Sequence, residues 1–410
     1  MHAHQYVVLF HQGHPHDAVQ GYPSLIPPAR HLQSSGRTVA CMNRSRPLNV
    51  AIVAPSMAIL GGQAVQADRL LTAWRNDPEV HGWLVPINPV LPGPLRHLTR
   101  IKYVRTLATQ LAYWPLLLKE LRKADVVHVF SASYFSFLLA PLPAVVVARL
   151  LGKPVVMNYR SGQAPDHLRR SPLARATLKR VDRNAVPSRF LRDVFAEFGI
   201  ASEIIPNIVD VEQFRFRRRD TLRPHVVSTR SFEDLYNLPC TLRAFRIIQD
   251  RYPDATLTLV GSGSQEPALR RLVATLALRH VTFAGRIDPE NIWRYYADTD
   301  IYLQTPDIDN MPSSVLEAFA SGCAVVSTTA GGVPAILSDQ VHGLLVPVND
   351  HEAAGAAVLR LLDQPGLATG LTEAAFASCA RYQWSSVRQQ WLQLYRSLAA
   401  SPAVPAPTPA

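Results

Sequence analysis

The sequence has few cysteines, and none is paired at a metal-binding spacing. Cys41, Cys240, Cys323 and Cys379 are widely separated, and no Cys-x-x-Cys pair occurs. Zinc ribbons need such pairs, and disulfide scaffolds need a denser set of cysteines. These two classes are therefore excluded, and the simplest expectation is a protein of a reducing, cytoplasmic compartment.

Lysine is also scarce, with five residues in 410, so the net charge of +11 comes mainly from arginine. A basic surface suits an anionic membrane, nucleotide phosphates or nucleic acid. A surface bias without any partner is the alternative. The sequence has no nucleic-acid reader module and no aromatic platform between basic residues, so no nucleic acid is expected as a partner.

No continuous apolar run is long enough to predict a membrane span. Val126 to Ala148 contains no charged residue, but Pro141 and Pro143 interrupt it, which favours a buried strand, a loop and a core helix. The first residues lack the basic and apolar regions of a signal peptide. Leu95 to Leu111 mixes basic and apolar residues. It predicts either an amphipathic helix on the anionic inner face of a membrane or a packed helix with solvated arginines.

Strands and helices alternate in two long series. The first begins with a buried strand, Leu48 to Ala54, followed by Gly61-Gly62 and a helix from Ala64 to Trp74. Such alternation predicts an α/β fold with two Rossmann-like, doubly wound domains facing a central cleft. The predicted parts are a disordered extension (1–47), an N-terminal domain (48–205), a linker (206–222), a C-terminal domain (223–380), a closing helix (381–399) and a flexible Pro/Ala tail (400–410).

The most informative stretch is Asp309-Asn-Met-Pro-Ser-Ser-Val-Leu-Glu317. Asp309 is predicted in a loop and Glu317 in the helix that follows, which Gly322 ends before another buried strand. Ligands of open α/β sheets bind at that edge. A carboxylate such as Glu317 can accept two hydrogen bonds from a vicinal diol. The alternatives are charge compensation at a helix N-terminus for Glu317 and an ordinary turn for Asp309.

Three further features follow predicted strands or turns. Arg230 ends a strand, where a guanidinium can bind a diphosphate through two hydrogen bonds. Gly61-Gly62 permits close backbone approach. Gly261-Ser-Gly-Ser matches only half of a dinucleotide fingerprint, because Glu266 stands where the third glycine would be.

The stretch from Asp309 to Glu317 resembles the acidic-x7-acidic motif of the group 1 (family 4) glycosyltransferases with the GT-B fold. Arg230, Val260-Gly261 and Ala330-Gly-Gly-Val-Pro334 fit the same family, and the resemblance extends from Leu48 to Leu398. It implies retaining transfer of a sugar from a nucleotide-sugar donor to a glycan, glycolipid or small-molecule acceptor, as in the synthesis of cell-surface polysaccharides. It also implies that no cofactor and no metal is needed.

The resemblance assigns roles to individual residues. Glu317 binds the donor ribose, Asp309 contacts the transferred sugar, and Arg230 stabilises the leaving diphosphate; these three form the predicted catalytic set. The remaining predicted donor-binding residues are Gly61, Gly62, Tyr236, Gly261, Asn310, Met311, Pro312, Ser313 and Ser314.

The sequence departs from the family pattern at two positions. Tyr236 stands where the family has a lysine that pairs with the arginine, so one positive charge is missing. Arg160 stands where many members have histidine, and arginine cannot act as a base at neutral pH. Arg160 and His128 are predicted on the acceptor side of the cleft; a core histidine is the alternative for His128.

Two other functions stay open at this point. A nucleotide-sugar epimerase of the same fold would need no acceptor, and a non-catalytic sugar-binding or scaffold relative would show no turnover. Asp298-Thr-Asp300 and Asp307-Ile-Asp309 also have the D-x-D spelling of metal-dependent transferases, but a structural role at a helix end is the preferred interpretation.

Overall fold

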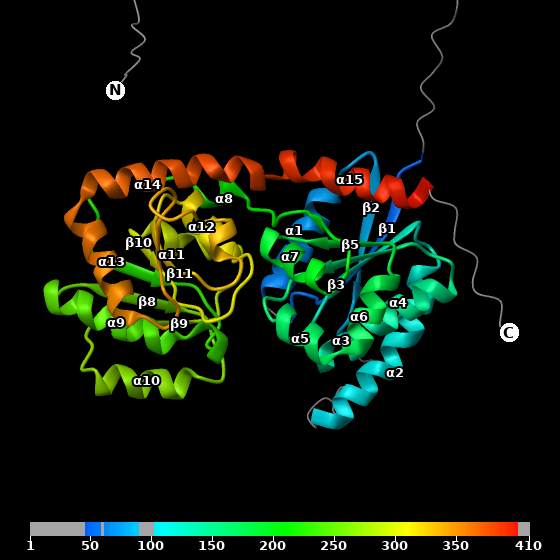
Figure 1. Cartoon of the computed structure of the whole chain (residues 1–410), viewed down its shortest axis with the longest axis horizontal. Coiled ribbons are helices and arrows are strands. Elements are labelled where there is room, and N and C mark those ends of the chain that lie inside the picture. The colour runs from blue at the N-terminus through cyan, green and yellow to red at the C-terminus, as the bar shows by residue number, and fades with distance from the viewer. Residues whose placement is uncertain (1–45, 59–60, 90–101, 401–410) are drawn as a thin grey trace, which may run out of the picture. The chain divides into compact units, whose positions relative to one another are not determined.

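The computed structural model describes residues 46–58, 61–89 and 102–400 (Figure 1). Nearly all of the predicted N-terminal extension (1–47) and of the predicted C-terminal tail (400–410) lies outside the described residues. The first part of the basic and apolar stretch, residues 95–101, lies outside them as well.

The N-terminal half contains a parallel six-stranded sheet in the order β2-β1-β3-β4-β5-β6. Its strands are β1 (Leu48–Ala54), β2 (Val80–Pro86), β3 (Val126–Ser131), β4 (Val155–Tyr159), β5 (Arg183–Val186) and β6 (Glu203–Ile204). Its helices are α1 (Gly62–Trp74), α2 (Lys102–Leu121), α3 (Phe135–Leu139), α4 (Pro141–Leu150), α5 (Ala164–Arg170), α6 (Pro172–Arg180) and α7 (Arg189–Glu197). Every residue of the central strands β3 and β4 is buried, without alternation, because helices cover both faces of the sheet.

The C-terminal half repeats this plan with the strand order β12-β11-β10-β7-β8-β9. Its strands are β7 (His225–Ser228), β8 (Thr256–Val260), β9 (Val281–Gly285), β10 (Ile301–Leu303), β11 (Ala324–Thr328) and β12 (Leu344–Val346). Its helices are α8 (Val211–Phe214), α9 (Leu238–Arg251), α10 (Glu266–Thr275), α11 (Trp293–Ala297), α12 (Ser313–Ala320), α13 (His351–Asp363) and α14 (Pro365–Ser378). Short 3₁₀ turns are η2 (Asp234–Tyr236), η3 (Val333–Ala335) and η4 (Cys379–Tyr382).

The last helix, α15 (Trp384–Ala400), returns to the N-terminal half (Figure 1). Trp391 and Tyr395 are buried there in one cluster with Val50 and Ile52 of β1. The C-terminal end of the described chain therefore completes the core around the first strand.

The predicted fold class is confirmed, since both halves are parallel, doubly wound α/β units. The strand predicted from Leu48 to Ala54 is β1, and Gly322 follows α12 with a left-handed φ of 72°. Three strands were not predicted: β2, β5 and β6. The stretch from Val126 to Ala148 forms β3 and most of α4, as expected, but the short helix α3 lies between them where a loop was predicted. The domain boundaries remain predictions.

An arginine cluster fastens the segment after α8 to the second sheet. Asp300 accepts hydrogen bonds from Arg217, from Arg219 Nε at 3.0 Å and from Arg223 Nε at 2.9 Å. The side chain of Arg219 is fully buried. Burial alone would raise the pKa of Asp300, but hydrogen bonds from Arg223 and Arg217 hold it well below its usual range. Asp300 is therefore a structural anchor.

Candidate active site

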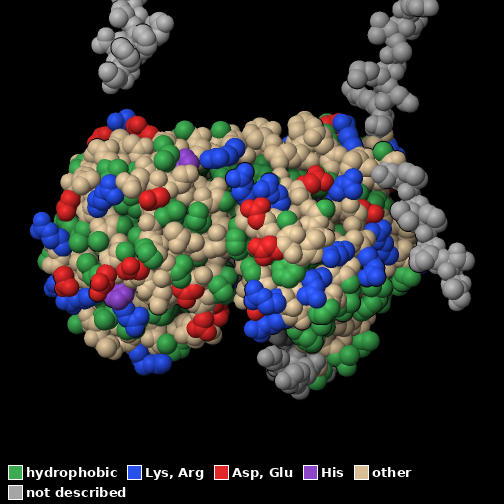
Figure 2. Space-filling view, viewed as in Figure 1, with side chains coloured by type: hydrophobic (Ala, Val, Ile, Leu, Met, Phe, Trp, Pro, Cys, Tyr) green, Lys and Arg blue, Asp and Glu red, His purple; other side chains and the backbone are tan. Residues whose placement is uncertain are grey.

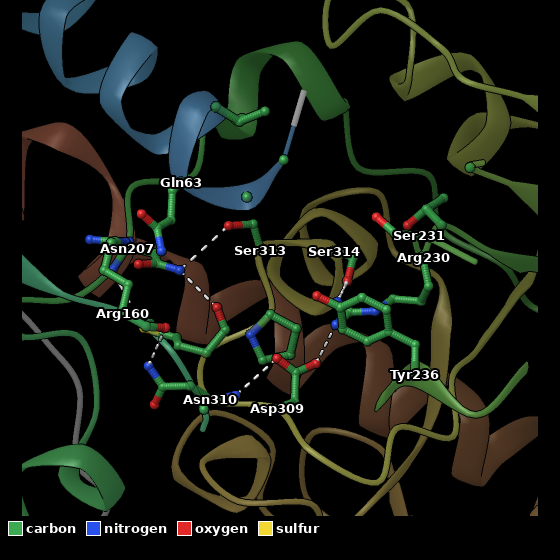
Figure 3. Close-up of a pocket in the computed structure, with 18 of the residues that line it drawn as sticks. Gln63, Arg160, Asn207, Arg230, Ser231, Tyr236, Asp309, Asn310, Ser313 and Ser314 are labelled. Atoms are coloured by element: carbon green, nitrogen blue, oxygen red, sulfur yellow. Dashed lines mark hydrogen bonds and ion pairs between the residues drawn. The ribbon is translucent and has the colours of Figure 1, made fainter. Parts of the chain in front are cut away.

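A cavity of about 500 Å³ lies at the carboxyl ends of strands from both sheets (Figure 3). Segments that follow β4, β7, β8, β9 and β10 line it, together with the start of α1. This is the edge at which ligands of parallel sheets bind. The cavity brings together all predicted site residues except one: Gly61, Gly62, Arg160, Arg230, Tyr236, Gly261, Asp309, Asn310, Met311, Pro312, Ser313, Ser314 and Glu317.

Glycines hold the backbone of Asp309 and Asn310 in place. Gly331 has φ of 50°, and a Cβ there would lie 2.1 Å from the carbonyl oxygen of Asp309. A Cβ at Gly162 would lie 2.9 Å from the same carbonyl group. Because real Cβ atoms do not approach so closely, larger residues at either position would displace the loop. Gly331 after β11 and Gly162 after β4 thus allow the backbone of Asp309 to pack closely against both segments.

Arg230 forms the centre of the C-terminal side. Its Nη2 lies 2.6 Å from Asp309 Oδ2, and its Nη1 donates to Ser314 Oγ at 3.1 Å. The guanidinium carbon lies 3.9 Å from the ring centroid of Tyr236, which is a cation–π contact. Burial opposes the charge, but Asp309 raises the pKa of Arg230, so the guanidinium stays charged. Tyr236, at the position of the missing lysine, thus supports Arg230 by stacking.

Asp309 has a less favourable environment for its charge. Burial raises its pKa above the usual aspartate value, although Arg230 and the backbone N–H of Asn310 both oppose that shift. The carboxylate keeps lone pairs that neither partner occupies. It is therefore able to accept a hydrogen bond from a ligand hydroxyl while its charge is compensated by Arg230.

Glu317 lies on α12 and is 8% exposed. Its Oε1 is 2.8 Å from Arg69 Nη2 on α1, and its Oε2 accepts from the Tyr296 hydroxyl at 3.0 Å. Each carboxylate oxygen thus has one partner and one free acceptor site, which fits a pair of vicinal hydroxyls. The ion pair with Arg69 also joins the two halves of the chain across the cavity.

Sequence reasoning missed several residues that build the cavity. Asn207 Nδ2 donates to the Met311 carbonyl at 2.7 Å, and Gln66 Nε2 donates to Ser313 Oγ at 3.0 Å. Gln66 and Arg69 are three residues apart, so both lie on one face of α1. The spacing of Gln66 and Arg69 directly after Gly61-Gly62 was a sequence signal for these two residues. The pair Pro206-Asn207 at the end of the first half was a signal for Asn207.

The two glycine loops differ in what their positions require. Gly261 has φ of 151°, and a Cβ there would lie 2.1 Å from the Arg230 carbonyl oxygen, so glycine is required by the fold. At Gly61 and Gly62 a Cβ would meet nothing within 4 Å. The glycine pair therefore leaves open space beside the cavity, as the prediction of close backbone approach by a ligand requires.

The structure places His128 in the core and not in the cavity. His128 is fully buried; its Nδ1 lies 2.7 Å from the Tyr395 hydroxyl, and Asn158 Nδ2 lies 3.0 Å from its Nε2. Burial, with Arg160 nearby, lowers its pKa to about 3, so it stays neutral. The predicted acceptor-side position was wrong, and the alternative of a core histidine is confirmed: side chains of a buried strand alternate between two covered faces, and His128 faces α15.

The structure gives three carboxylates of the two D-x-D sequences partners within the protein. Asp300 is held by arginines, Asp309 is paired with Arg230, and Asp307 accepts from Asn237 Nδ2 at 2.8 Å. Within the described ranges, no group of three or more His, Cys, Asp and Glu side chains is placed to hold a metal ion.

The family models and the similar proteins that match this chain are all glycosyltransferases. Residues 60–213 match the model of Glycosyltransferase Family 4, and residues 211–377 match that of Glycosyl transferases group 1. A GDP-mannose-dependent alpha-(1-6)-phosphatidylinositol monomannoside mannosyltransferase of Mycolicibacterium smegmatis is 30% identical over 245 residues, 54% of this chain and 63% of that protein. A D-inositol 3-phosphate glycosyltransferase of Corynebacterium urealyticum is 32% identical over 169 residues, which are 39% of this chain and 40% of that protein. The alignments thus span less than two thirds of these relatives.

Solved structures share the fold at low identity. HepE of Anabaena in complex with UDP-glucose superposes with a TM-score of 0.68 at 16% identity, covering 85% of this chain and all of that one. Sucrose-phosphate synthase of Thermosynechococcus elongatus gives a TM-score of 0.70 at 20% identity, covering 86% of this chain and all of that one. The architecture is that of the GT-B glycosyltransferases. The chain belongs to group 1 (family 4) of these enzymes, because the two family models together match residues 60–377.

Proposed function

We propose that this protein is a retaining glycosyltransferase that moves a sugar from a nucleotide-sugar donor to a hydroxyl of an acceptor. The observation that carries the proposal is the joint placement of Arg230, Asp309 and Glu317 in one cavity beside the open Gly61-Gly62 loop. Family membership and the names of the relatives, which are sugar transferases, support transfer over epimerisation or scaffolding.

In the proposed reaction, Arg230 and the backbone N–H groups near Gly61 stabilise the charge that develops on the leaving diphosphate. Asp309 and its loop orient the sugar, and Glu317 holds the ribose hydroxyls. The bond between the anomeric carbon and the diphosphate oxygen breaks as the acceptor oxygen bonds to the same face of that carbon. The acceptor proton passes to the leaving oxygen, so no protein nucleophile is needed.

The names of similar proteins support a class of donor and of acceptor. HepE has been solved with UDP-glucose, and the mycobacterial relative is named as a GDP-mannose-dependent phosphatidylinositol monomannoside mannosyltransferase. We expect a nucleotide sugar on the side of Glu317 and a glycan, glycolipid or small-molecule acceptor on the side of Arg160. A role in cell-surface polysaccharide or glycoconjugate synthesis fits these substrates.

We expect transfer without a cofactor or a metal ion. Arg230 can compensate the charge of the diphosphate. The carboxylates that would bind a divalent ion already have arginine or amide partners. Activity that is unchanged by EDTA is the expected result, and activity restored only by Mg²⁺ or Mn²⁺ would contradict it.

A cytoplasmic protein that rests on the inner face of a membrane is the proposed location. Among the described residues, no helix is long and apolar enough to cross a bilayer. However, α2 exposes an apolar row at helical spacing, with Leu107 64% and Leu111 69% exposed, and Phe135 of α3 is 66% exposed. Figure 2 shows hydrophobic side chains gathered where Figure 1 places α2 and α4, beside lysines and arginines. Such a combination suits anionic lipid.

Calorimetric titration with a panel of nucleotide sugars, with and without EDTA, tests the proposed function. We expect one nucleotide sugar to bind with and without EDTA, and Glu317→Ala to weaken that binding by about 10–100-fold. Incubation with that donor then separates the alternatives by product. Sugar transferred to an acceptor supports the proposal, an epimerised donor indicates the epimerase, and binding without turnover indicates the scaffold.

A further inference from the structure

Arg160 has few partners for a guanidinium in a cavity wall. It follows β4 and lines the cavity, and its Nη1 donates to Asn158 Oδ1 at 3.2 Å. Its Nη2 is buried and has no hydrogen-bond partner among the described residues. No carboxylate of the described chain lies within ion-pair distance of Arg160, whereas Arg69 and Arg230, which line the same cavity, both have one.

The side chain of Arg160 is held from behind by a continuous network. The Tyr395 hydroxyl contacts His128 Nδ1, His128 Nε2 contacts Asn158 Nδ2, and Asn158 Oδ1 accepts from Arg160. In this arrangement the amide of Asn158 is fixed, because each of its two ends has one partner. The guanidinium also lies over the ring of Phe130, at 5.5 Å from its centroid. Arg160 is thus positioned by packing and hydrogen bonds rather than by a counter-ion.

Such an arrangement has an energetic cost without a ligand. A buried charge is normally paired, and leaving a guanidinium without an anion is unfavourable. Burial accordingly lowers the pKa of Arg160 to about 9, but the group still carries its charge at neutral pH. The remaining N–H donors and the uncompensated charge fit an anionic oxygen pair that enters from the cavity.

Arg160 also lies close to the loop assigned to the transferred sugar. Its carbonyl oxygen accepts from Asn310 Nδ2 at 3.3 Å (Figure 3). A Cβ at Gly162 would lie 2.9 Å from the backbone carbonyl of Asp309, so the two segments pack closely. We propose that Arg160 binds a carboxylate, sulfonate or phosphate group of the substrate next to the reacting centre, and that it selects anionic substrates over neutral ones. This inference rests on the proposed function. The anionic group belongs either to the acceptor or to the transferred sugar.

Calorimetry with matched ligand pairs distinguishes these two sources. In the donor arm, UDP-glucose is compared with UDP-glucuronic acid, and GDP-mannose with GDP-mannuronic acid. In the acceptor arm, protein saturated with UDP or GDP is titrated with glucose or glucose 6-phosphate and with inositol or inositol 3-phosphate. Each titration uses the full chain, Arg160→Gln and, as a matched control, Arg169→Gln. Arg169 is an exposed arginine of α5 outside the cavity lining.

We expect the anionic member of one pair to bind wild type and Arg169→Gln at least about tenfold more tightly than the neutral member, as suits a charged hydrogen bond. Arg160→Gln should lose that preference, while its affinity for UDP or GDP alone stays unchanged. A preference in the donor arm assigns the group to the sugar, and one in the acceptor arm assigns it to the acceptor.

Two results would overturn the inference: equal binding of both members of every pair to wild type, or a preference that survives in Arg160→Gln. Failure of the proposed function gives a different result, because then neither UDP nor GDP binds to any variant. In that case the acceptor pairs, titrated into the protein alone, still decide whether Arg160 recognises an anion.

Discussion

Each wall of the cavity carries an arginine, Arg230 or Arg160, and the two guanidiniums differ in how their charge is compensated. On the C-terminal side, Arg230 is paired with Asp309 and stacked on Tyr236 before any ligand arrives. On the N-terminal side, the Arg160 side chain has one hydrogen bond and no counter-ion among the described residues, and a Cβ at Gly61 or Gly62 would meet nothing within 4 Å. Preorganised dipoles and charges stabilise a developing charge without reorganisation. In the proposed reaction, Arg230 therefore serves the chemical step and Arg160 serves recognition of the substrate.

The largest effect is expected from Arg230→Ala, which breaks the paired wall. The substitution removes the cation near the leaving group and leaves Asp309 buried without its partner. The turnover number should fall by roughly 10²–10³-fold, as for other groups that stabilise developing charge. Steady-state kinetics with the identified donor measure it, and Arg230→Lys, which restores a point charge, should recover part of the loss. Wild-type activity in Arg230→Ala would refute the assignment.

Glu317→Ala should weaken donor binding by about 10–100-fold, because a charged hydrogen bond contributes about 1.5–3 kcal/mol. Calorimetry with the donor measures the change. Arg69→Met serves as the matched control, since it breaks the ion pair between the halves but leaves the carboxylate in place. If Arg69→Met weakens binding as much as Glu317→Ala, the contribution of Glu317 is structural rather than a contact with the ribose.

On the unpaired wall, Arg160→Gln should stabilise the ligand-free protein by about 1 kcal/mol at pH 7, as substitutions that remove a functional strain commonly do. The pKa of Arg160 is near 9, lower than that of the unfolded chain, so the folded protein loses this proton first as pH rises. The difference between variant and wild type should therefore shrink as pH rises through about 9. Thermal unfolding across pH measures it; a destabilised variant at pH 7 would contradict the unpaired charge.

The smallest effect is expected outside the cavity, on the exposed row of α2. Leu107→Ser combined with Leu111→Ser should reduce binding to vesicles with anionic lipid several-fold, because apolar contact area is lost. The free energy of unfolding should change by less than about 0.5 kcal/mol, since both side chains are largely exposed. Co-sedimentation with vesicles measures the binding. Equal binding by variant and wild type would remove this face from the proposed membrane contact.

Local sequence patterns predicted much of the fold and of the C-terminal wall. The buried strands β1, β3 and β4 are largely apolar runs. Such runs can be recognised in the sequence without knowing which strand pairs with which. The loop from Asp309 into α12 was predicted as it is found, with Gly322 after the helix. In contrast, β5 begins with Arg183 and Asn184 and β6 begins with Glu203, so neither strand is an apolar run.

The N-terminal wall was harder to predict because its residues acquire their roles through contacts distant in sequence. Gln66 reaches Ser313, and Arg69 reaches Glu317, both across more than 240 positions. His128 was misplaced because nothing near it in sequence reveals that Tyr395 lies against it. The burial of Arg219 against Asp300 was not predicted either, because Asp300 is distant in sequence and arginine-rich segments usually lie in solvent.

The position of α15 has a consequence for how the chain matures during synthesis. The face of the first sheet around β1 is covered by Trp391 and Tyr395, which the ribosome adds more than 300 residues after β1. Domains generally fold as units in the order of their synthesis, but this one cannot complete its core until the last helix emerges. We therefore expect the nascent N-terminal half to expose an apolar face of its sheet until α15 has been synthesised.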